Sequence, residues 1–171
     1  SSLSVIAGTS ERSTGGNIIL ASGVSKSSSS GSILLQSGHG GSSGNVSISS
    51  GTASSGRSGT VLITTGDSLT SESGSININT GTSNQGHAGN IELFGGTSSS
   101  ATGGAVSIRS GRSKVGTSGQ ISAGTGKSDS GSGALSMFTG ASLRNSGKLV
   151  VKSGGSMDGS SGNIAFIAGD S

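Results

Sequence analysis

One eight-residue pattern recurs twelve times along the chain and restricts the possible folds more than any other feature. Each copy reads glycine, any residue, aliphatic, any residue, aliphatic, any residue, small residue, glycine, as residues 89–96 illustrate. A short run of mostly small polar residues separates the copies, and the period is 15 residues with occasional spacings of 13 or 14. A fixed period identifies a repeat architecture. The chain is therefore an array of one short unit.

Two columns of the aligned repeats contain only glycine. The first glycine follows the small residue of each copy: Gly8, Gly23, Gly38, Gly51, Gly66, Gly81, Gly96, Gly111, Gly126, Gly140, Gly154 and Gly169. The closing glycine precedes the next copy: Gly16, Gly31, Gly44, Gly59, Gly74, Gly89, Gly104, Gly119, Gly133, Gly147 and Gly162. Glycine is the residue that tolerates φ > 0 and close backbone approach, so both columns predict corners where the chain reverses direction.

Between the closing glycine and the next first glycine, apolar residues alternate with other residues. Alternation with a period of two is typical of a strand with one buried face. The two aliphatic columns and the small column that follows them should then point inward; in the second repeat these are Ile18, Leu20 and Ser22. In the polar half of the repeat a serine column is also predicted to point inward: Ser10, Ser25, Ser68, Ser83, Ser98, Ser113, Ser128, Ser142 and Ser156.

These patterns together predict a single all-β domain over residues 1–171. The expected architecture is a two-walled parallel β-solenoid (β-helix) with about 15 residues per turn and twelve turns. Aliphatic side chains would line one wall, and serine, alanine and glycine would line the other. The first and last residues fall inside the repeat pattern, so we expect the array to be a window of a longer repeat protein.

Composition offers disorder as the alternative. The chain contains 35 glycines and only 2% aromatic residues, a composition common in flexible linkers. The strict alternation in every copy favours a folded array. The chain has no cysteine, which excludes disulfides and cysteine-based metal sites, and no apolar run approaches the ~20 residues that a membrane-spanning helix needs.

The repeat unit resembles the turns of short-coil, Ser/Gly-rich parallel β-solenoids. These include β-helical antifreeze proteins and repeat regions of extracellular proteins of microbes and algae. The resemblance covers the whole chain at the level of turn length and residue type, and it implies an extracellular or cell-surface location. It also raises ice binding as a hypothesis, but the outward columns are irregular and are interrupted by Glu92, Arg109 and Lys152.

Two surface features suggest partners. Residues 105–152 carry seven basic residues against Asp129 alone, which would suit an anionic polysaccharide, silica or nucleic acid, or form a solvated face. Ile19 and Leu34 occupy the same outward column in adjacent repeats and would form an apolar patch for lateral packing against another array, or an ordinary surface.

Catalytic signatures are weak in this sequence. His39 and His87 fall in different repeats, and no carboxylate recurs at a register that would pair it with another. Glu92 and Arg109 suggest a diagonal cross-strand ion pair. Asp67, Asp129, Asp158 and Asp170 lack the recurrence of calcium-binding repeats, and no glycine-rich loop has the ending of a phosphate-binding loop. We therefore expect no enzymatic activity, no catalytic, cofactor-binding or metal-binding residues and no cofactor.

The function predicted from sequence is structural. We expect a rigid rod or filament that serves as an extracellular fibre, surface appendage, wall or adhesive component and that self-associates end to end or laterally. The alternative is a surface-recognition module that binds ice or polysaccharide along its outward face. No specific nucleic-acid partner and no membrane span are expected.

Overall fold

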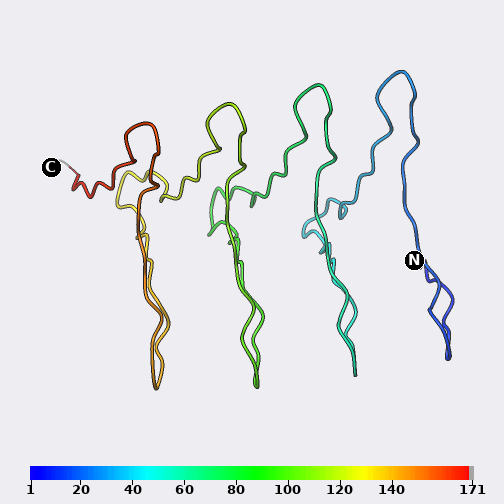
Figure 1. Cartoon of the computed structure of the whole chain (residues 1–171). Helices are drawn as coiled ribbons and strands as arrows, with labels where there is room; N and C mark the ends of the chain where they lie inside the picture. Colours follow the sequence, from blue (N-terminus) through cyan, green and yellow to red (C-terminus); the bar gives the residue numbers. More distant parts are fainter. Residues whose placement is uncertain (170–171) are drawn as a thin grey trace. The chain divides into compact units, whose positions relative to one another are not determined.

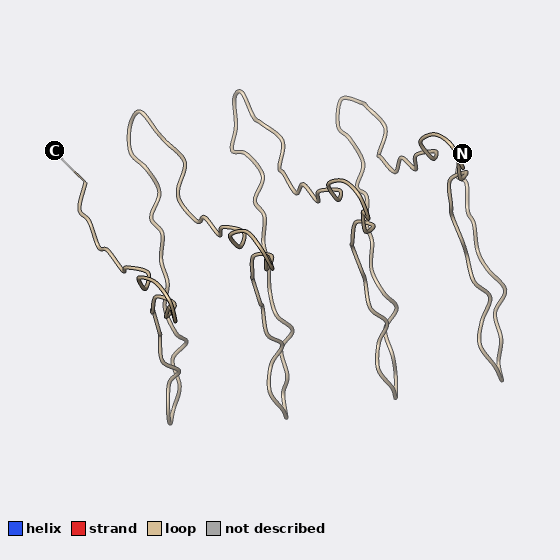
Figure 2. Ribbon diagram, turned by 45° about the horizontal axis from the view of Figure 1, so that its top comes forward, coloured by secondary structure: helices blue, strands red, loops and turns tan. Residues whose placement is uncertain are grey.

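The computed structural model describes residues 1–169, and within this range the chain forms no helix and no β-strand. The whole path consists of loops and extended segments (Figure 2). The chain divides into two units, Ser1–Gly89 and Asn90–Ser171. The prediction of an all-β, two-walled β-solenoid or β-helix is therefore wrong. The protein is mostly coil, with a regular sequence repeat along that coil.

The solvent-accessible surface shows how open the chain is. It amounts to 17585 Å². A compact protein of 16.1 kDa would expose roughly 7,400 Å² and its fully unfolded chain about 23,000 Å². The chain thus stays nearer to the unfolded value, and the hydrophobic core that a solenoid would build between its walls does not form.

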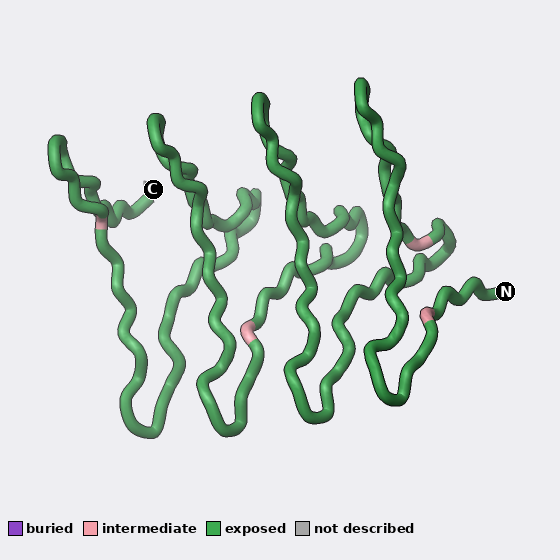
Figure 3. The backbone as a smooth tube through the Cα atoms, turned by 45° about the vertical axis from the view of Figure 1, so that its right-hand side comes forward, coloured by how far each residue is buried: buried purple, intermediate pink, exposed green. Residues whose placement is uncertain are grey.

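Among residues 1–169 no side chain is buried, and only four residues are half-buried (Figure 3). These four are Ala7, Ser37, Gly95 and Ser153. All of them belong to the small column, which directly precedes the first glycine. In these four repeats the best-shielded residue is therefore the small residue, whereas the sequence pattern suggested the aliphatic pair.

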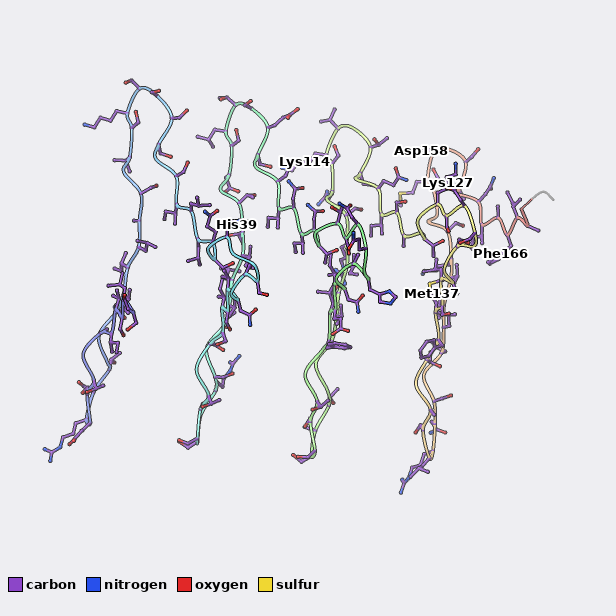
Figure 4. The ribbon with its side chains drawn as sticks, turned by 180° about the vertical axis from the view of Figure 1, so that it is seen from behind. His39, Lys114, Lys127, Met137, Asp158 and Phe166 are labelled. Atoms are coloured by element: carbon purple, nitrogen blue, oxygen red, sulfur yellow. The ribbon has the colours of Figure 1, made fainter. Side chains whose placement is uncertain are left out.

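The predicted alternation of faces survives in weakened form in some repeats and is lost in others, since Phe166 and Ile167 are both 89% exposed. In residues 61–63, Val61 is 48% exposed, Leu62 is 78% exposed and Ile63 is 68% exposed. The residue expected to face outward is the most exposed of the three, as predicted. The two expected to face inward are not covered, however, because no second wall lies over them. Met137 and Phe166, also predicted to face inward, likewise lie open to solvent (Figure 4).

The backbone hydrogen bonds agree with the absence of a solenoid. A solenoid requires bonds between successive turns, because a single turn cannot bury its own apolar face. Outside regular elements, the bonds found here join residues of one repeat only: Gly16 to Gly8, Gly31 to Gly23, Gly104 to Gly96, Gly119 to Gly111 and Gly162 to Gly154. The sequence pattern did not establish that neighbouring repeats touch, and without that contact no inner face forms.

The prediction about glycine conformation is also corrected. No glycine of the described chain has a positive φ, and no peptide bond there is cis. The chain therefore reverses direction without left-handed residues. Close backbone approach, the other reason expected from the sequence, applies to several closing glycines, whereas the first glycines have open space around them.

The polar half of each repeat forms a loop that projects from the path of the chain (Figure 1). In the first unit, the loops near residues 26 and 70 project in one direction, and the loops near residues 12 and 55 project in another. In the second unit, the loops near residues 114 and 157 again share a direction. Loops three repeats apart are therefore equivalent in orientation within each unit.

Candidate functional site

The repeated loop is the best-defined local structure in the chain. Five loops are closed by a bond from the N–H of the closing glycine to the carbonyl oxygen of the first glycine, with N···O distances of 2.8–3.4 Å. In all five, the two glycines lie eight residues apart, as in Gly23 and Gly31. The short loop between Gly38 and Gly44 is instead tied by a bond between the hydroxyls of Ser37 and Ser43, 3.3 Å apart.

Five closing glycines have too little room for a side chain because the opposite side of the neck lies close to them: Gly16, Gly31, Gly74, Gly104 and Gly119. A Cβ added at Gly31 would lie 3.3 Å from the Cβ of Ser22, and one added at Gly74 would lie 3.3 Å from the methyl group of Thr65. At the one repeat in which the small residue is itself a glycine, Gly95, an added Cβ would collide with the carbonyl oxygen of Gly104. The small column and the closing glycine thus form the two sides of a tight neck.

One member of the small column also bonds across this neck. The hydroxyl of Ser22 donates to the carbonyl oxygen of Gly31 at 2.8 Å. The Gly31 N–H in turn donates to the Gly23 carbonyl at 2.9 Å. Two hydrogen bonds therefore hold the neck of this loop, and neither involves another repeat.

Inside the loop, the serine two residues after the first glycine fixes the bend. Its Oγ accepts a hydrogen bond from a backbone N–H three residues later, for example from Ala101 to Ser98 at 2.9 Å and from Gly116 to Ser113 at 2.9 Å. Such local serine bonds are a recognised alternative to regular secondary structure. The same bond, or its two-residue variant, forms at every serine of the column predicted from sequence: Ser10, Ser25, Ser68, Ser83, Ser98, Ser113, Ser128, Ser142 and Ser156.

The serine column was therefore recognised, but its role was misassigned. Its members accept hydrogen bonds from the loop backbone and do not line an inner wall. Two repeats lack a serine at this position and carry Gly40 and Ala53 there. One sequence signal could have revealed that these serines accept hydrogen bonds from the loop backbone. The column holds a single type of hydroxyl residue followed by a short polar run, which is typical of a turn capped by serine.

The charged residues lie mostly in these loops, and all of them in the described chain are exposed. Lys114, Lys127 and Asp158 stand on loops, as does His39, in a different unit from these three (Figure 4). His39 and His87 lie in separate loops, as expected from sequence. The basic residues of the range 105–152 are distributed over successive loops and the segments between them.

The predicted ion pair between Glu92 and Arg109 has no support in the geometry. The side-chain hydrogen bonds of the described residues involve serine hydroxyls, and none connects Glu92 with Arg109. Ile19 and Leu34 are both strongly exposed. Ice binding along outward columns stays a prediction, and residues 1–169 contain no sheet that would present those columns as a flat face.

No pocket is found in the part of the chain that the structure describes. The same part contains no group of three or more histidine, aspartate or glutamate side chains arranged to hold a metal ion. No helix of residues 1–169 is long and apolar enough to cross a bilayer. Comparisons of the chain with protein-family models, with curated proteins and with solved structures found no match.

What the arrangement offers chemically is a periodic surface. Nearly every repeat presents two exposed apolar side chains, and most repeats add a loop with internal hydrogen bonds. Apolar side chains and unpaired extended backbone are the two features through which chains add to one another. The candidate functional site is therefore the aliphatic ladder, defined as the two aliphatic columns of all repeats, framed by the loops.

Proposed function

We propose that the chain is a structural repeat protein that assembles with further copies of itself into a fibre, wall or adhesive material. The observation that carries this proposal is the exposure of the aliphatic ladder. Ile91 is 54% exposed and Leu93 is 68% exposed, and the corresponding residues of the other repeats behave alike. Because apolar surface recurs at a nearly constant period, association can bury equivalent surface in every repeat.

The free energy available for association depends on how much apolar surface the aliphatic ladder exposes. Burying apolar area contributes roughly 25 cal/mol per Å², and one fully buried aliphatic side chain contributes about 1.5–3 kcal/mol. In the isolated chain most of this free energy is unused, because no described residue is buried. Association between repeats of different copies would recover it many times over, since the ladder has two aliphatic positions in nearly every repeat.

The proposed role is mechanical and non-catalytic, and stiffness would come from the assembly. Five loops are closed by their own backbone hydrogen bonds, which hold those repeats at a defined spacing. The aliphatic ladder then supplies the contacts between copies. The Ser/Gly-rich composition, similar to that of extracellular repeat regions, supports an extracellular or cell-surface setting.

Self-association as a function of concentration tests the proposal. Sedimentation velocity on the full chain should show a monomer at low concentration and larger species as concentration rises, with electron microscopy showing elongated assemblies. A chain that remains monomeric up to the concentrations at which structural proteins accumulate would refute the proposal.

A further inference from the structure

Four loops, each of seven residues, follow one another at intervals of three repeats. We name them L2 (residues 24–30), L5 (67–73), L8 (112–118) and L11 (155–161). L2 and L5 project in the same direction in the first unit, and L8 and L11 do so in the second (Figure 1). The spacing is constant: 43 residues separate Gly23 from Gly66 and also Gly111 from Gly154.

The formal charges of these four loops alternate in sign. L2 is positive and L5 is negative; L8 is positive and L11 is negative. The charged residues, in chain order, are Lys26 in L2, Asp67 and Glu72 in L5, Arg112 and Lys114 in L8, and Asp158 in L11. All of these side chains are exposed.

The remaining loops show no such alternation. Those at 39–43, 82–88 and 97–103 carry no formal charge with histidine neutral, and those at 9–15 and 127–132 balance one acid with one base. Arg57 and Arg144 give the other two loops a single positive charge each. Sign alternation is therefore confined to one set of equivalent loops.

We infer that copies of the chain associate side by side and parallel, with a stagger of three repeats set by this alternation. The inference rests on the proposed self-assembly and adds its register. A stagger of three repeats places L2 of one copy against L5 of the next, and L8 against L11. Every one of these contacts joins opposite charges.

Other parallel registers are less favourable. With no stagger each charged loop faces its own like charge, which is destabilising. A stagger of one repeat sets L2 and L8 against loops of zero net charge and leaves attraction only between L5 and the loop of Arg57 and between L11 and the loop of Arg144. A stagger of two repeats sets L2 against the loop of Arg57 and L8 against the loop of Arg144, and both contacts are repulsive. Only the three-repeat stagger is attractive along the whole set.

An antiparallel pair is the competing arrangement, because it sets L2 against L11 and L5 against L8. Such a two-fold pair is closed and cannot grow, whereas a parallel stagger repeats the same head-to-tail offset and extends without limit. Growth is what the proposed structural role requires. The parallel stagger also uses the same 43-residue offset within each unit.

Cross-linking can read the register directly, since the described chain contains no free cysteine and the sequence has none. Two full-length single-cysteine variants are prepared, Ser27→Cys in L2 and Ser71→Cys in L5. One carries ¹⁵N, so that mass spectrometry separates mixed from like disulfides. The variants are mixed at low salt at a concentration at which the chain associates, and they are then oxidised gently with diamide. Ser42→Cys, in the uncharged loop of the next repeat, replaces Ser71→Cys in the control mixture.

The inference predicts that the mixed disulfide between the Ser27→Cys and Ser71→Cys variants forms in excess over random pairing, and that no such excess forms with Ser42→Cys. The excess should disappear in 1 M salt, where the Debye length falls to about 3 Å. A charge variant with unchanged net charge provides the second test. It combines Asp67→Lys, Glu72→Lys, Arg112→Glu and Lys114→Glu, which exchanges the signs of L5 and L8. This variant should abolish the excess of the mixed disulfide, whereas the charges of an antiparallel pair would still be complementary.

The outcomes separate the two levels of the argument. Interchain disulfides that form mainly between like variants, or an excess that survives the charge variant, would show that the chain assembles in another register and would overturn the stagger alone. Absence of any interchain disulfide, together with a monomeric chain in sedimentation, would overturn the self-assembly as well.

Discussion

Gly104 donates its backbone N–H to the carbonyl oxygen of Gly96 at 2.8 Å, and a Cβ added at Gly104 would lie only 2.8 Å from the nitrogen of Gly96. A Cβ added at Gly96 would meet nothing within 4 Å. The two invariant glycines of this loop are thus under different constraints. Gly104 has no room for a side chain. At Gly96 there is room, and its φ is not positive, so neither steric contact nor backbone conformation requires glycine there.

This asymmetry gives the first prediction. Gly104→Ala should break the bond to Gly96, because the new Cβ and the Gly96 backbone cannot occupy the same space. One such hydrogen bond contributes about 1 kcal/mol, so the N–H of residue 104 should exchange with solvent several-fold faster. Gly96→Ala is the matched control and should leave that rate unchanged. Equal effects of the two substitutions, measured by NMR hydrogen exchange, would contradict the account.

The loop serine gives the second prediction. Ser98→Ala removes the acceptor of the Ala101 N–H, which lies 2.9 Å from Oγ. The bend should loosen by about 0.5–1.5 kcal/mol, seen as faster exchange at Ala101 and a shift of its amide resonance. Ser99→Ala, one residue away, has no bond to lose and serves as the control. An unchanged Ala101 resonance in the Ser98 variant would show that the hydroxyl does not fix the bend.

Several features of these loops could be predicted from the sequence. The two glycine columns and the serine column were aligned correctly, and the order of exposure within residues 61–63 follows the predicted alternation. These features depend on contacts within one repeat. A repeated sequence reports such local constraints reliably, because every copy repeats the same steric and hydrogen-bonding requirement.

The prediction of a solenoid was wrong for a related reason. Stacking depends on contacts between repeats. The two-residue spacing of Ile18 and Leu20 is the same whether a second wall covers these side chains or solvent does. The role of Ser22 opposite Gly31 was also missed, because the two columns lie in different halves of the repeat. Of the two reasons for glycine expected from the sequence, positive φ is absent from the described residues, whereas close approach across the neck accounts for several of the closing glycines.

The aliphatic ladder gives the third prediction. Ile91→Asp should leave the dilute chain unchanged, because Ile91 is already 54% exposed and covers nothing. It should weaken self-association by about tenfold or more, since a charge replaces about 1.5–3 kcal/mol of apolar burial at each contact. Leu143→Asp introduces the same charge on a fully exposed residue of the loop at 141–146, outside L2, L5, L8 and L11, and should have a much smaller effect. Sedimentation velocity at several concentrations measures both variants.

Heating gives the fourth prediction. Cooperative unfolding requires a core whose burial is lost all at once, and no residue in the described range is buried. Differential scanning calorimetry of the dilute chain should therefore show no heat-absorption peak. A peak should emerge only at concentrations at which the chain associates. A concentration-independent transition would show that a single copy has a core of its own.

Amide hydrogen exchange of the aliphatic ladder, followed by NMR from dilute to associating conditions, tests the central claim most directly. The account predicts that the amides of Ile91 and Leu93 exchange at nearly unprotected rates in the dilute chain, whereas the closing glycine Gly104 shows modest protection from its bond to Gly96. Strong protection of the ladder should develop only as copies associate. Ladder amides that are strongly protected in a dilute monomer would contradict the account, because they would require hydrogen bonds between repeats of a single chain.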